Sequence, residues 1–288
     1  GKDTGQLPSC EISECIFVSN IDSSNNGHGV YIKYENDFPT TIVISECQFL
    51  DNGDLSNNNH EGYSISAEIP TLTISDTHIK FTNADQSTAG LFVGPHTNSL
   101  NLNTINFLNN YEIGIRLKTS NPLTISRCTF NNVPAGILLD SDYQNFVGFN
   151  IESSTSSEVL IKYAPNEPQS KLDISQLTIN SLSFSGYVFL FENINEVNLS
   201  NSNIQNLQSG SKIFQNTPQI LTIDGCNFVS NNLNSDGGAL FIDSNCESVT
   251  IKNSEFTSNT AGNKNPLKGG AIFIDSTESK GAEVTITN

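Results

Sequence analysis

A pattern of eleven residues recurs along the chain, and it limits the fold more than any other feature. One copy reads LTIDGCNFVSN from Leu221 to Asn231, with inward-type residues at positions 1, 3, 6 and 8 and Asn at position 11. Copies begin at residues 10, 42, 72, 100, 123, 147, 172, 197, 221, 249 and 284. Because recurrence at such a period is typical of solenoids, we expect each copy to form one unit that stacks on the next.

Each copy predicts two short strands, and a third follows it. Positions 1 and 3 alternate with polar residues, as in a strand with one buried face, and positions 6 and 8 resume the alternation after a bend. A third apolar stretch begins with Gly at residues 29–32, 90–93, 114–117, 136–139, 238–241 and 270–273. We therefore predict an all-β, right-handed parallel β-helix of about ten to eleven coils, roughly 50 Å long at the usual strand spacing. Residues 1–288 would form a single segment of a longer shaft.

Stacking would align equivalent side chains in columns along the rod. Position 3 gives an apolar column: Ile12, Ile44, Ile74, Leu102, Ile125, Ile174, Leu199, Ile223, Ile251 and Ile286. Position 8 gives a column of Phe and Ile: Phe17, Phe49, Ile79, Phe107, Phe130, Ile179, Ile204, Phe228 and Phe256. Position 11 gives a ladder of amides at a turn where Asn tolerates left-handed backbone: Asn20, Asn52, Asn110, Asn231 and Asn259. We interpret these columns as structural.

The charge balance removes several classes of partner. The chain carries 30 acidic and 13 basic residues, a net charge of −17, and its only Arg residues are Arg116 and Arg127. Nucleic acid and anionic membranes are bound through basic residues. No apolar run approaches the roughly 20 residues of a membrane-spanning helix. We expect neither nucleic acid nor a membrane span in this segment.

Position 6 holds four of the six cysteines: Cys15, Cys47, Cys128 and Cys226. Thr77, Ser202 and Ser254 occupy the same position in other copies, which indicates a small inward slot where Cys acts as a compact hydrophobe. Cys15 and Cys47 fall on neighbouring coils, so the sequence leaves open whether they form a disulfide. No CxxC pair and no Cys/His metal spacing occurs, and we predict no metal and no cofactor.

Two copies pair FxxN with a following GGA[IL]. These are Phe228–Asn231 with Gly237–Leu240, and Phe256–Asn259 with Gly269–Ile272. The pair resembles the repeats of chlamydial polymorphic outer-membrane proteins and of similar large surface proteins in bacteria and protists. FxxN extends the resemblance thinly over most of the chain, whereas the full pair covers the last two coils. The resemblance implies a secreted, surface-exposed β-helix without catalytic residues.

Parallel β-helices also include polysaccharide hydrolases and lyases, and three groups of residues are candidates for such a site. Gly27-His28-Gly29 is similar to a polygalacturonase motif, but only Asp22 precedes it and no matching basic R-x-K follows. Glu14, Glu46 and Asp76 share position 5 and could form a carboxylate row, although a solvated bend explains them. Asp140 and Asp142 offer too few ligands for calcium.

The outward positions carry two further signals. Positions 2 and 4 read T-x-S at Thr73 and Thr124, a hydroxyl array like that of β-helical ice-binding proteins, which is interrupted at Glu11, Asn101, Asp173, Asn198 and Lys252. Thr and Ser are ordinary on strand exteriors, which argues against ice binding. Asn198-Leu199-Ser200 is a sequon and makes Asn198 a candidate glycosylation site.

We therefore predict a non-catalytic structural or adhesive shaft of an extracellular or cell-surface protein. Uncapped coils at its ends would favour end-to-end self-association or a place within a longer shaft. The alternative is a carbohydrate-active enzyme of hydrolase or lyase type, or a glycan-binding module. Glycans or other surface proteins would be the partners, and binding is most expected at the insertions around residues 20–28, 53–62 and 260–268. A cluster of carboxylates with a basic or aromatic residue on one exterior face would favour the alternative.

Overall fold

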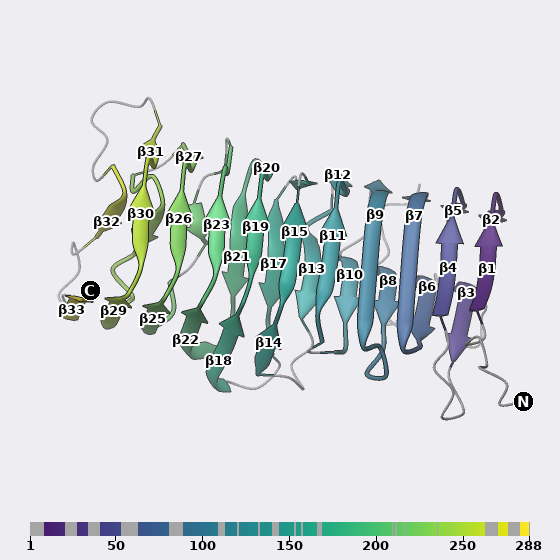
Figure 1. Ribbon diagram of the computed structural model, residues 1–288, viewed down its shortest axis with the longest axis horizontal. Coiled ribbons are helices and arrows are strands. Elements are labelled where there is room, and N and C mark those ends of the chain that lie inside the picture. Colours follow the sequence, from purple (N-terminus) through teal and green to yellow (C-terminus); the bar gives the residue numbers. More distant parts are fainter. Residues whose placement is uncertain are drawn as a thin grey trace, which may run out of the picture.

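The chain winds into the right-handed parallel β-helix that the repeat predicted (Figure 1). The computed structural model describes residues 9–20, 28–33, 41–52, 63–80, 89–108, 113–119, 121–131, 133–139, 144–152, 154–156, 158–165, 169–208, 210, 212–215, 217–234, 236–262, 270–275 and 283–287. All strand pairs in this part of the chain are parallel, as coils that wind in one direction require. No helix within it has the length and hydrophobicity that crossing a membrane would demand.

Three long ladders of strands form three sides of the rod. The first lies at the front of Figure 1 and consists of β1 (Ser9–Ser13), β4 (Thr41–Ser45), β7 (Thr71–Lys80), β9 (Ser99–Leu108), β11 (Leu123–Ser126), β15 (Phe149–Glu152), β19 (Thr178–Asn180), β23 (Asn203–Gln205), β26 (Asn227–Val229) and β30 (Glu255–Thr257). The second lies behind it and consists of β3 (His28–Lys33), β6 (Tyr63–Glu68), β8 (Ala89–Val93), β10 (Ile113–Leu117), β13 (Ala135–Leu139), β17 (Val159–Tyr163), β21 (Tyr187–Phe191) and β24 (Lys212–Phe214). The third lies below and consists of β14 (Asn145–Val147), β18 (Gln169–Ser175), β22 (Ile194–Ser200), β25 (Ile220–Asp224), β29 (Ser248–Lys252) and β33 (Glu283–Thr287).

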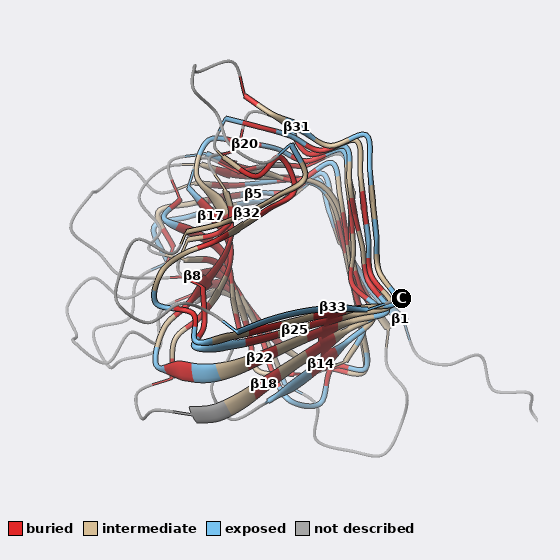
Figure 2. Ribbon diagram, turned by 90° about the vertical axis from the view of Figure 1, so that its left-hand side faces the viewer, coloured by how far each residue is buried: buried red, intermediate tan, exposed pale blue. Residues whose placement is uncertain are grey.

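Short strands close the remaining side, at the top of Figure 2. They are β2 (Ile16–Val18), β5 (Gln48–Leu50), β12 (Thr129–Asn131), β16 (Thr155–Ser156), β20 (Ser183–Phe184), β27 (Asn232–Leu233) and β31 (Thr260–Ala261). Near the end of the rear ladder, β28 (Leu240–Ile242) pairs with β32 (Ile272–Ile274). Figure 2 looks along the rod and shows that strands on every side carry buried residues.

Left-handed residues make the corners between these sides. Position 5 has positive φ in copy after copy: Glu14, Glu46, Asp76, Thr104, Arg127, Gln176, Asn201, Gly225 and Asn253. Position 10 does the same at Ser19, Asp51, Ser181, Asn206, Ser230 and Ser258. The sequence placed the left-handed turn at the Asn of position 11, whereas the structure places it one residue earlier. A residue with positive φ bends the chain sharply between two strands, so two per repeat produce two corners.

The copy assigned to Val147 has the wrong register. Phe146 pairs with Ile174 of the next coil, which makes Phe146 a position 3 residue and moves the start of this copy to residue 144. Gly148, with φ of 77°, then falls at position 5 like its counterparts. The irregular spacing of apolar residues in this copy hid the correct start.

After this irregular coil, each position of the repeat lies on the neighbouring side of the rod. Ile125 at position 3 stacks on Ile151, and Ile151 stacks on Ile179 at position 8. Phe130 at position 8 stacks instead on Ser156. The single columns predicted for positions 3 and 8 are therefore wrong, because each consists of two separate columns. The additional strand β14 starts the third ladder, and later copies begin on that new side.

In several coils Gly is the second residue of the third strand, because a Phe ring occupies the space where a Cβ would lie. A Cβ atom at Gly114 would lie 2.8 Å from Phe130 Cδ1, and one at Gly90 would lie 2.9 Å from Phe107 Cδ1. Both distances are shorter than real Cβ contacts allow. At these two positions the Phe of position 8 therefore leaves room only for Gly.

Candidate functional site

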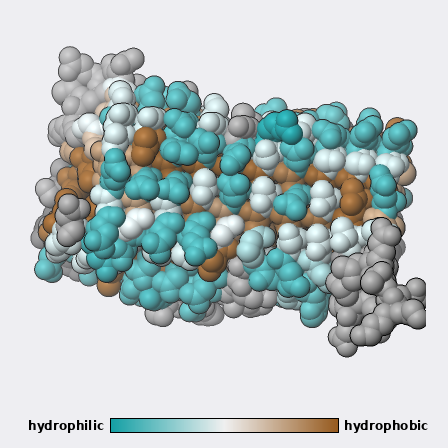
Figure 3. Space-filling view, in the orientation of Figure 1, coloured by the Kyte–Doolittle hydropathy of each residue, from teal (hydrophilic) through white to brown (hydrophobic). Residues whose placement is uncertain are grey.

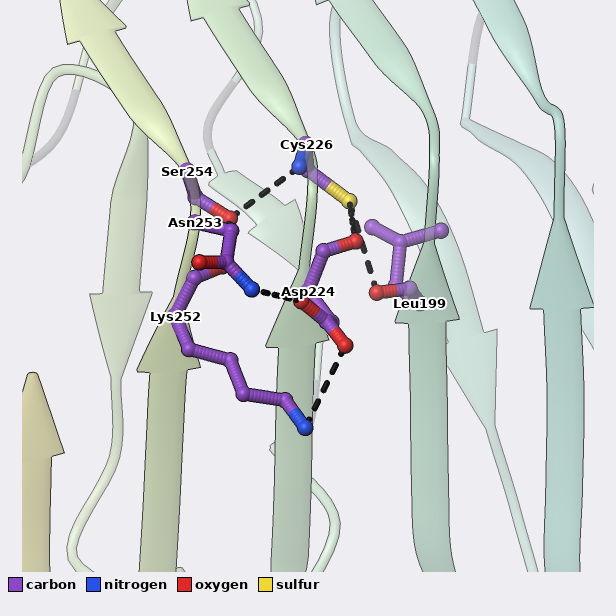
Figure 4. Close-up of polar contacts among 6 residues, drawn as sticks. All are labelled: Leu199, Asp224, Cys226, Lys252, Asn253 and Ser254. Atoms are coloured by element: carbon purple, nitrogen blue, oxygen red, sulfur yellow. Dashed lines mark hydrogen bonds and ion pairs between the residues drawn. The ribbon is translucent and has the colours of Figure 1, made fainter. Parts of the chain in front are cut away.

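Position 6 forms two columns of hydrogen bonds at the corners of the rod, one in each half of the chain. Where it holds Cys, Ser or Thr, the side chain donates to the carbonyl two residues earlier: Ser202 Oγ to Ser200 at 2.7 Å and Thr77 Oγ1 to Ser75 at 2.7 Å. The hydroxyl also accepts the backbone N–H of position 6 on the preceding coil, as Ser254 Oγ does from Cys226 at 3.1 Å (Figure 4). The slot therefore selects small donors, and Cys shares it as a donor as well as a small hydrophobe.

Four of the thiols at and near these columns are buried, and burial raises the pKa of each. All six cysteines are free thiols, with Cys47, Cys128, Cys226 and Cys246 buried. Burial raises the pKa of Cys128 and of Cys246 to about 11. A thiol with a raised pKa is a poor nucleophile and a poor metal ligand at neutral pH. These cysteines therefore act as packing and hydrogen-bonding residues of the corner.

The Asn side chains of position 11 bond to one another across coils. Asn20 Nδ2 donates to Asn52 Oδ1 at 2.7 Å, and Asn231 Nδ2 donates to Asn259 Oδ1 at 3.0 Å. Asn52 and Asn231 are fully buried. Asn110 lies outside the described residues. These are two separate amide contacts, because the buried Leu182 and Leu207 occupy position 11 between them.

Each amide also caps a neighbouring coil. Asn52 Nδ2 donates to the Phe17 carbonyl at 2.8 Å, and Asn259 Nδ2 donates to the Phe228 carbonyl at 2.8 Å. The partner is in both cases the position 8 carbonyl of the preceding coil. A buried amide with such partners avoids the cost of an unsatisfied polar group. The FxxN motif is therefore a coil-to-coil contact between Phe and Asn of successive repeats.

The six Phe residues predicted at position 8 form three stacked pairs. Ring centroids lie 4.7 Å apart for Phe17 and Phe49, 5.0 Å for Phe107 and Phe130, and 4.7 Å for Phe228 and Phe256. The interplanar angles are 7°, 6° and 4° in the same order. The first two pairs belong to the top side, and the last pair belongs to the front ladder.

The exterior of the front ladder, called the front face below, carries two straight rows of mostly short polar side chains, and Arg127 Nη2 donates to Asn103 Oδ1 of the second row at 2.7 Å. The first row is Glu11, Val43, Thr73, Asn101, Thr124, Asn150, Thr178, Asn203, Asn227 and Glu255. The second row is Ser13, Ser45, Ser75, Asn103, Ser126, Glu152, Asn180, Gln205, Val229 and Thr257. Figure 3 views this face, on which pale and teal side chains follow one another along the rod.

The exterior of the third ladder, called the lower face below, carries charged pairs instead. Lys252 Nζ lies 3.2 Å from Asp224 Oδ2 (Figure 4), and Lys171 Nζ lies 3.2 Å from Asp173 Oδ1. Asn198 is part of this network, since its Nδ2 donates to Asp173 Oδ1 at 2.8 Å and to Glu196 Oε1 at 3.2 Å. Glycosylation of Asn198 stays a prediction, and it would require the amide to leave both carboxylates.

The exterior of the rear ladder, called the rear face below, combines aromatic and basic side chains, which the sequence reading missed. The register places Tyr31, Ser66, Phe92, Arg116, Leu138, Lys162 and Leu190 in one outward row. The rings of Tyr63 and Phe92 stack at 4.9 Å, and Arg116 Nη1 donates to Tyr63 Oη at 3.4 Å. Only the third residue of each Gly-led strand points outward, and that weak signal could have revealed the row.

The other candidates from the sequence are not assembled into a site. Glu14, Glu46 and Asp76 are exposed at left-handed corners. Gly29 packs against Phe49, where a Cβ would come within 2.9 Å of the ring. Asp22, Gly27, Asp140, Asp142 and most of the three insertions lie outside the described residues. Within the described part of the chain, no three His, Cys, Asp or Glu residues come together as metal ligands.

Comparison with known proteins agrees with this architecture. The family model for the right handed beta helix region matches residues 114–288, which is more than half of the chain. The chain therefore belongs to the right-handed β-helix family. Searches of curated proteins and of solved structures found no match.

Proposed function

We propose that the chain is a non-catalytic structural shaft of an extracellular or cell-surface protein. The observation that carries the proposal is the use of polar side chains for bonds between coils. The Asn231 and Asn259 side chains bond to a neighbouring coil, and Ser254 Oγ accepts the Cys226 N–H of a neighbouring coil while it donates to Lys252 of its own. Such bonds hold the coils in register and leave these groups unavailable to a substrate.

The sequence resemblance supports the same function. The FxxN and GGA[IL] pair is similar to repeats of chlamydial polymorphic outer-membrane proteins, and the residues of both motifs have a structural role. Gly237 has a φ of 68°, and a Cβ at Gly238 would lie 2.3 Å from the Gly270 carbonyl oxygen. Ala239 is completely buried. A motif made of packing residues is expected in a shaft, where the same coil is repeated to gain length.

Electron microscopy of the purified chain, combined with small-angle scattering, tests the proposal. A shaft predicts a rigid rod about 43–50 Å long at the usual strand spacing, with no change of shape on dilution. The same images test the alternative of end-to-end association, because stacked molecules would appear as fibres. A compact or flexible particle would contradict the shaft.

A carbohydrate-active role is the second candidate, and the rear face supports it. Aromatic rings stack on sugars, and Tyr31 and Phe92 stand in the same outward row as Arg116 and Lys162. Lys162 Nζ lies 3.5 Å from Glu192 Oε2, so a carboxylate also lies beside this row. The test is incubation with neutral and acidic polysaccharides, followed by assays for new reducing ends and for unsaturated products. If the chain releases either product and Arg116→Ala does not, an enzyme is favoured over a shaft.

A further inference from the structure

Two cysteines of position 6 lie side by side on neighbouring coils. Strand β1 pairs with β4 just before Cys15 and Cys47, and β2 pairs with β5 just after them, in the same register (Figure 1). The Gln48 N–H donates to the Cys15 carbonyl at 2.9 Å. Two residues further on, the ring centroids of Phe17 and Phe49 lie 4.7 Å apart. This spacing between coils falls within the roughly 4.4–6.8 Å that separates the Cα atoms of a disulfide.

The two thiols contact one another across the coils. Burial is the main cause that raises the pKa of the Cys47 thiol, and a hydrogen bond with the Cys15 thiol also raises it. Each thiol donates to a carbonyl of its own coil, Cys15 Sγ to Ser13 at 3.1 Å and Cys47 Sγ to Ser45 at 3.1 Å. A thiol is a weak donor, so a disulfide that replaces these bonds loses little.

The other cysteines of position 6 have a hydroxyl neighbour on the next coil instead of a second sulfur. The Cys128 N–H donates to Ser154 Oγ at 3.2 Å, and the Cys226 N–H donates to Ser254 Oγ at 3.1 Å. Both cysteines are buried. They share the slot, the burial and the hydrogen bonds of Cys47, but not its sulfur partner, and are therefore its internal controls.

The two sulfur atoms differ in access to solvent. Cys15 is partly exposed, whereas Cys47 is completely buried. A small-molecule disulfide would therefore meet Cys15 first. The Cys15 thiolate attacks one of its sulfur atoms, forms a mixed disulfide and releases one thiolate; the Cys47 thiolate then attacks the Cys15 sulfur and releases the second. The two protein thiols are oxidised to one disulfide, the oxidant is reduced to two thiols, and these take up the protons that the cysteines lose.

We propose that Cys15 and Cys47 are a disulfide-forming pair that joins two neighbouring coils when the chain meets a small-molecule disulfide such as oxidised glutathione. The bond fixes the register of these coils covalently, in addition to the hydrogen bonds between them. Environments outside the cell favour such bonds. The inference concerns one contact between two coils and goes beyond the proposed shaft function, on which it does not depend.

Peptide mapping of the native full chain tests the inference. The chain is incubated with oxidised glutathione, its remaining thiols are alkylated in urea, and it is cleaved with a protease specific for Glu. Cleavage after Glu14 and Glu46 separates Cys10, Cys15 and Cys47 onto different peptides. Mass spectrometry should find the peptide that begins at Cys15 linked to the peptide that begins at Cys47.

Cys47→Ser is the matched variant, because Ser is the natural residue of this position at Ser202. It should retain glutathione at Cys15 as a mixed disulfide, since no second thiol displaces it. Cys128 and Cys226 should remain thiols under the same treatment. Thermal unfolding identifies a variant that fails to fold, and Cys15→Ser, which should leave Cys47 unmodified because of its burial, provides a second variant.

Hydrogen exchange measures the consequence for the coils. The Glu14 N–H donates to the Ser45 carbonyl at 3.1 Å and should exchange roughly 10-fold more slowly or slower still after oxidation, because the bond opposes local opening. The Asn203 N–H, which donates to Leu177 in the distant half of the rod, should not change. Oxidation of Cys47→Ser should slow neither amide.

Three results would overturn the inference. They are a disulfide from Cys10 to either cysteine, mixed disulfides alone in the unsubstituted chain, and a Cys15–Cys47 bond that forms only when the oxidant acts in urea. Equal slowing of the Glu14 amide in Cys47→Ser would also overturn it, because glutathione on Cys15 would then suffice. Each of these results leaves the shaft standing, which the rods in the microscope test separately.

Discussion

Replacing Asn231 by Ala tests the claim that amides of position 11 hold the coils together. The Asn231 side chain accepts the Leu207 N–H at 3.1 Å and donates to the Ile204 carbonyl at 3.0 Å. Its second Nδ2 hydrogen bonds to Asn259 Oδ1 at 3.0 Å. Asn231 is 0% exposed, so water cannot replace these bonds. A buried group that loses its partner costs about 1–3 kcal/mol, and the two backbone groups together predict a loss of about 2–6 kcal/mol.

Asn227→Ala is the matched control for this change. It deletes the same atoms from the same coil, but Asn227 is exposed on the front face, where water replaces the bond to Asn203. Its free energy of unfolding should change by less than about 0.5 kcal/mol. Urea denaturation of the full chain, followed by far-ultraviolet circular dichroism, measures both variants.

Hydrogen exchange complements the denaturation experiment, because stacked coils can open locally before the whole chain unfolds. The Leu207 amide should exchange faster in Asn231→Ala than in the unsubstituted chain, while Asn227→Ala should leave it unchanged. The reasoning is refuted if the two variants have the same urea midpoint and the same exchange at Leu207. In that case apolar packing alone would set the register of the coils.

Three further predictions concern packing, reactivity and titration. Gly114→Ala should destabilise the chain by about 1–3 kcal/mol through overpacking, while Gly270→Ala, with no atom within 4 Å of the new Cβ, should leave the melting temperature nearly unchanged. Cys128 should resist alkylation in the native chain at neutral pH and react faster only as the pH approaches its raised pKa of about 11, as peptide mass spectrometry can follow. The Asn253 amide, which donates to Asp224 at 2.9 Å, lowers the pKa of that carboxyl, and Asn253→Ala should raise it in an NMR titration.

The lowered pKa of Asp224 also makes the stability of the fold depend on pH. A lowered pKa stabilises the chain above the unfolded value of about 3.9, and this contribution disappears as the pH falls through the lower folded value. An unchanged Asp224 pKa in Asn253→Ala would contradict the assigned cause. Rapid alkylation of Cys128 at neutral pH would show that the corner opens to solvent. Equal melting temperatures for Gly114→Ala and Gly270→Ala would contradict the claim that the Phe130 ring leaves no room for a Cβ at residue 114.

Several features could be predicted from residues close together in the chain. Alternation at positions 1 and 3 and at positions 6 and 8 indicates short strands, and its recurrence indicates a solenoid. The position 11 column also predicted that Asn residues of neighbouring copies lie together, and Asn231 indeed donates to Asn259. The donor function of position 6 was also readable, since Cys, Ser and Thr share that position and are all small donors.

The identity of each exterior face depended on the tertiary structure alone. Local pattern makes Thr124 and Thr222 equivalent, yet the additional strand β14 shifts the repeat by one side, and the two residues stand on different faces. Pairing between coils is set by how many residues the chain uses to go once around, and the irregular stretch from 144 to 156 changes that path. The sequence by itself therefore determined the coil, the inward columns within each half and the motif contacts. Only the tertiary structure decided that the rows of mostly short polar side chains share one face and the charged pairs of the lower face another, because register between distant coils is a property of the whole winding.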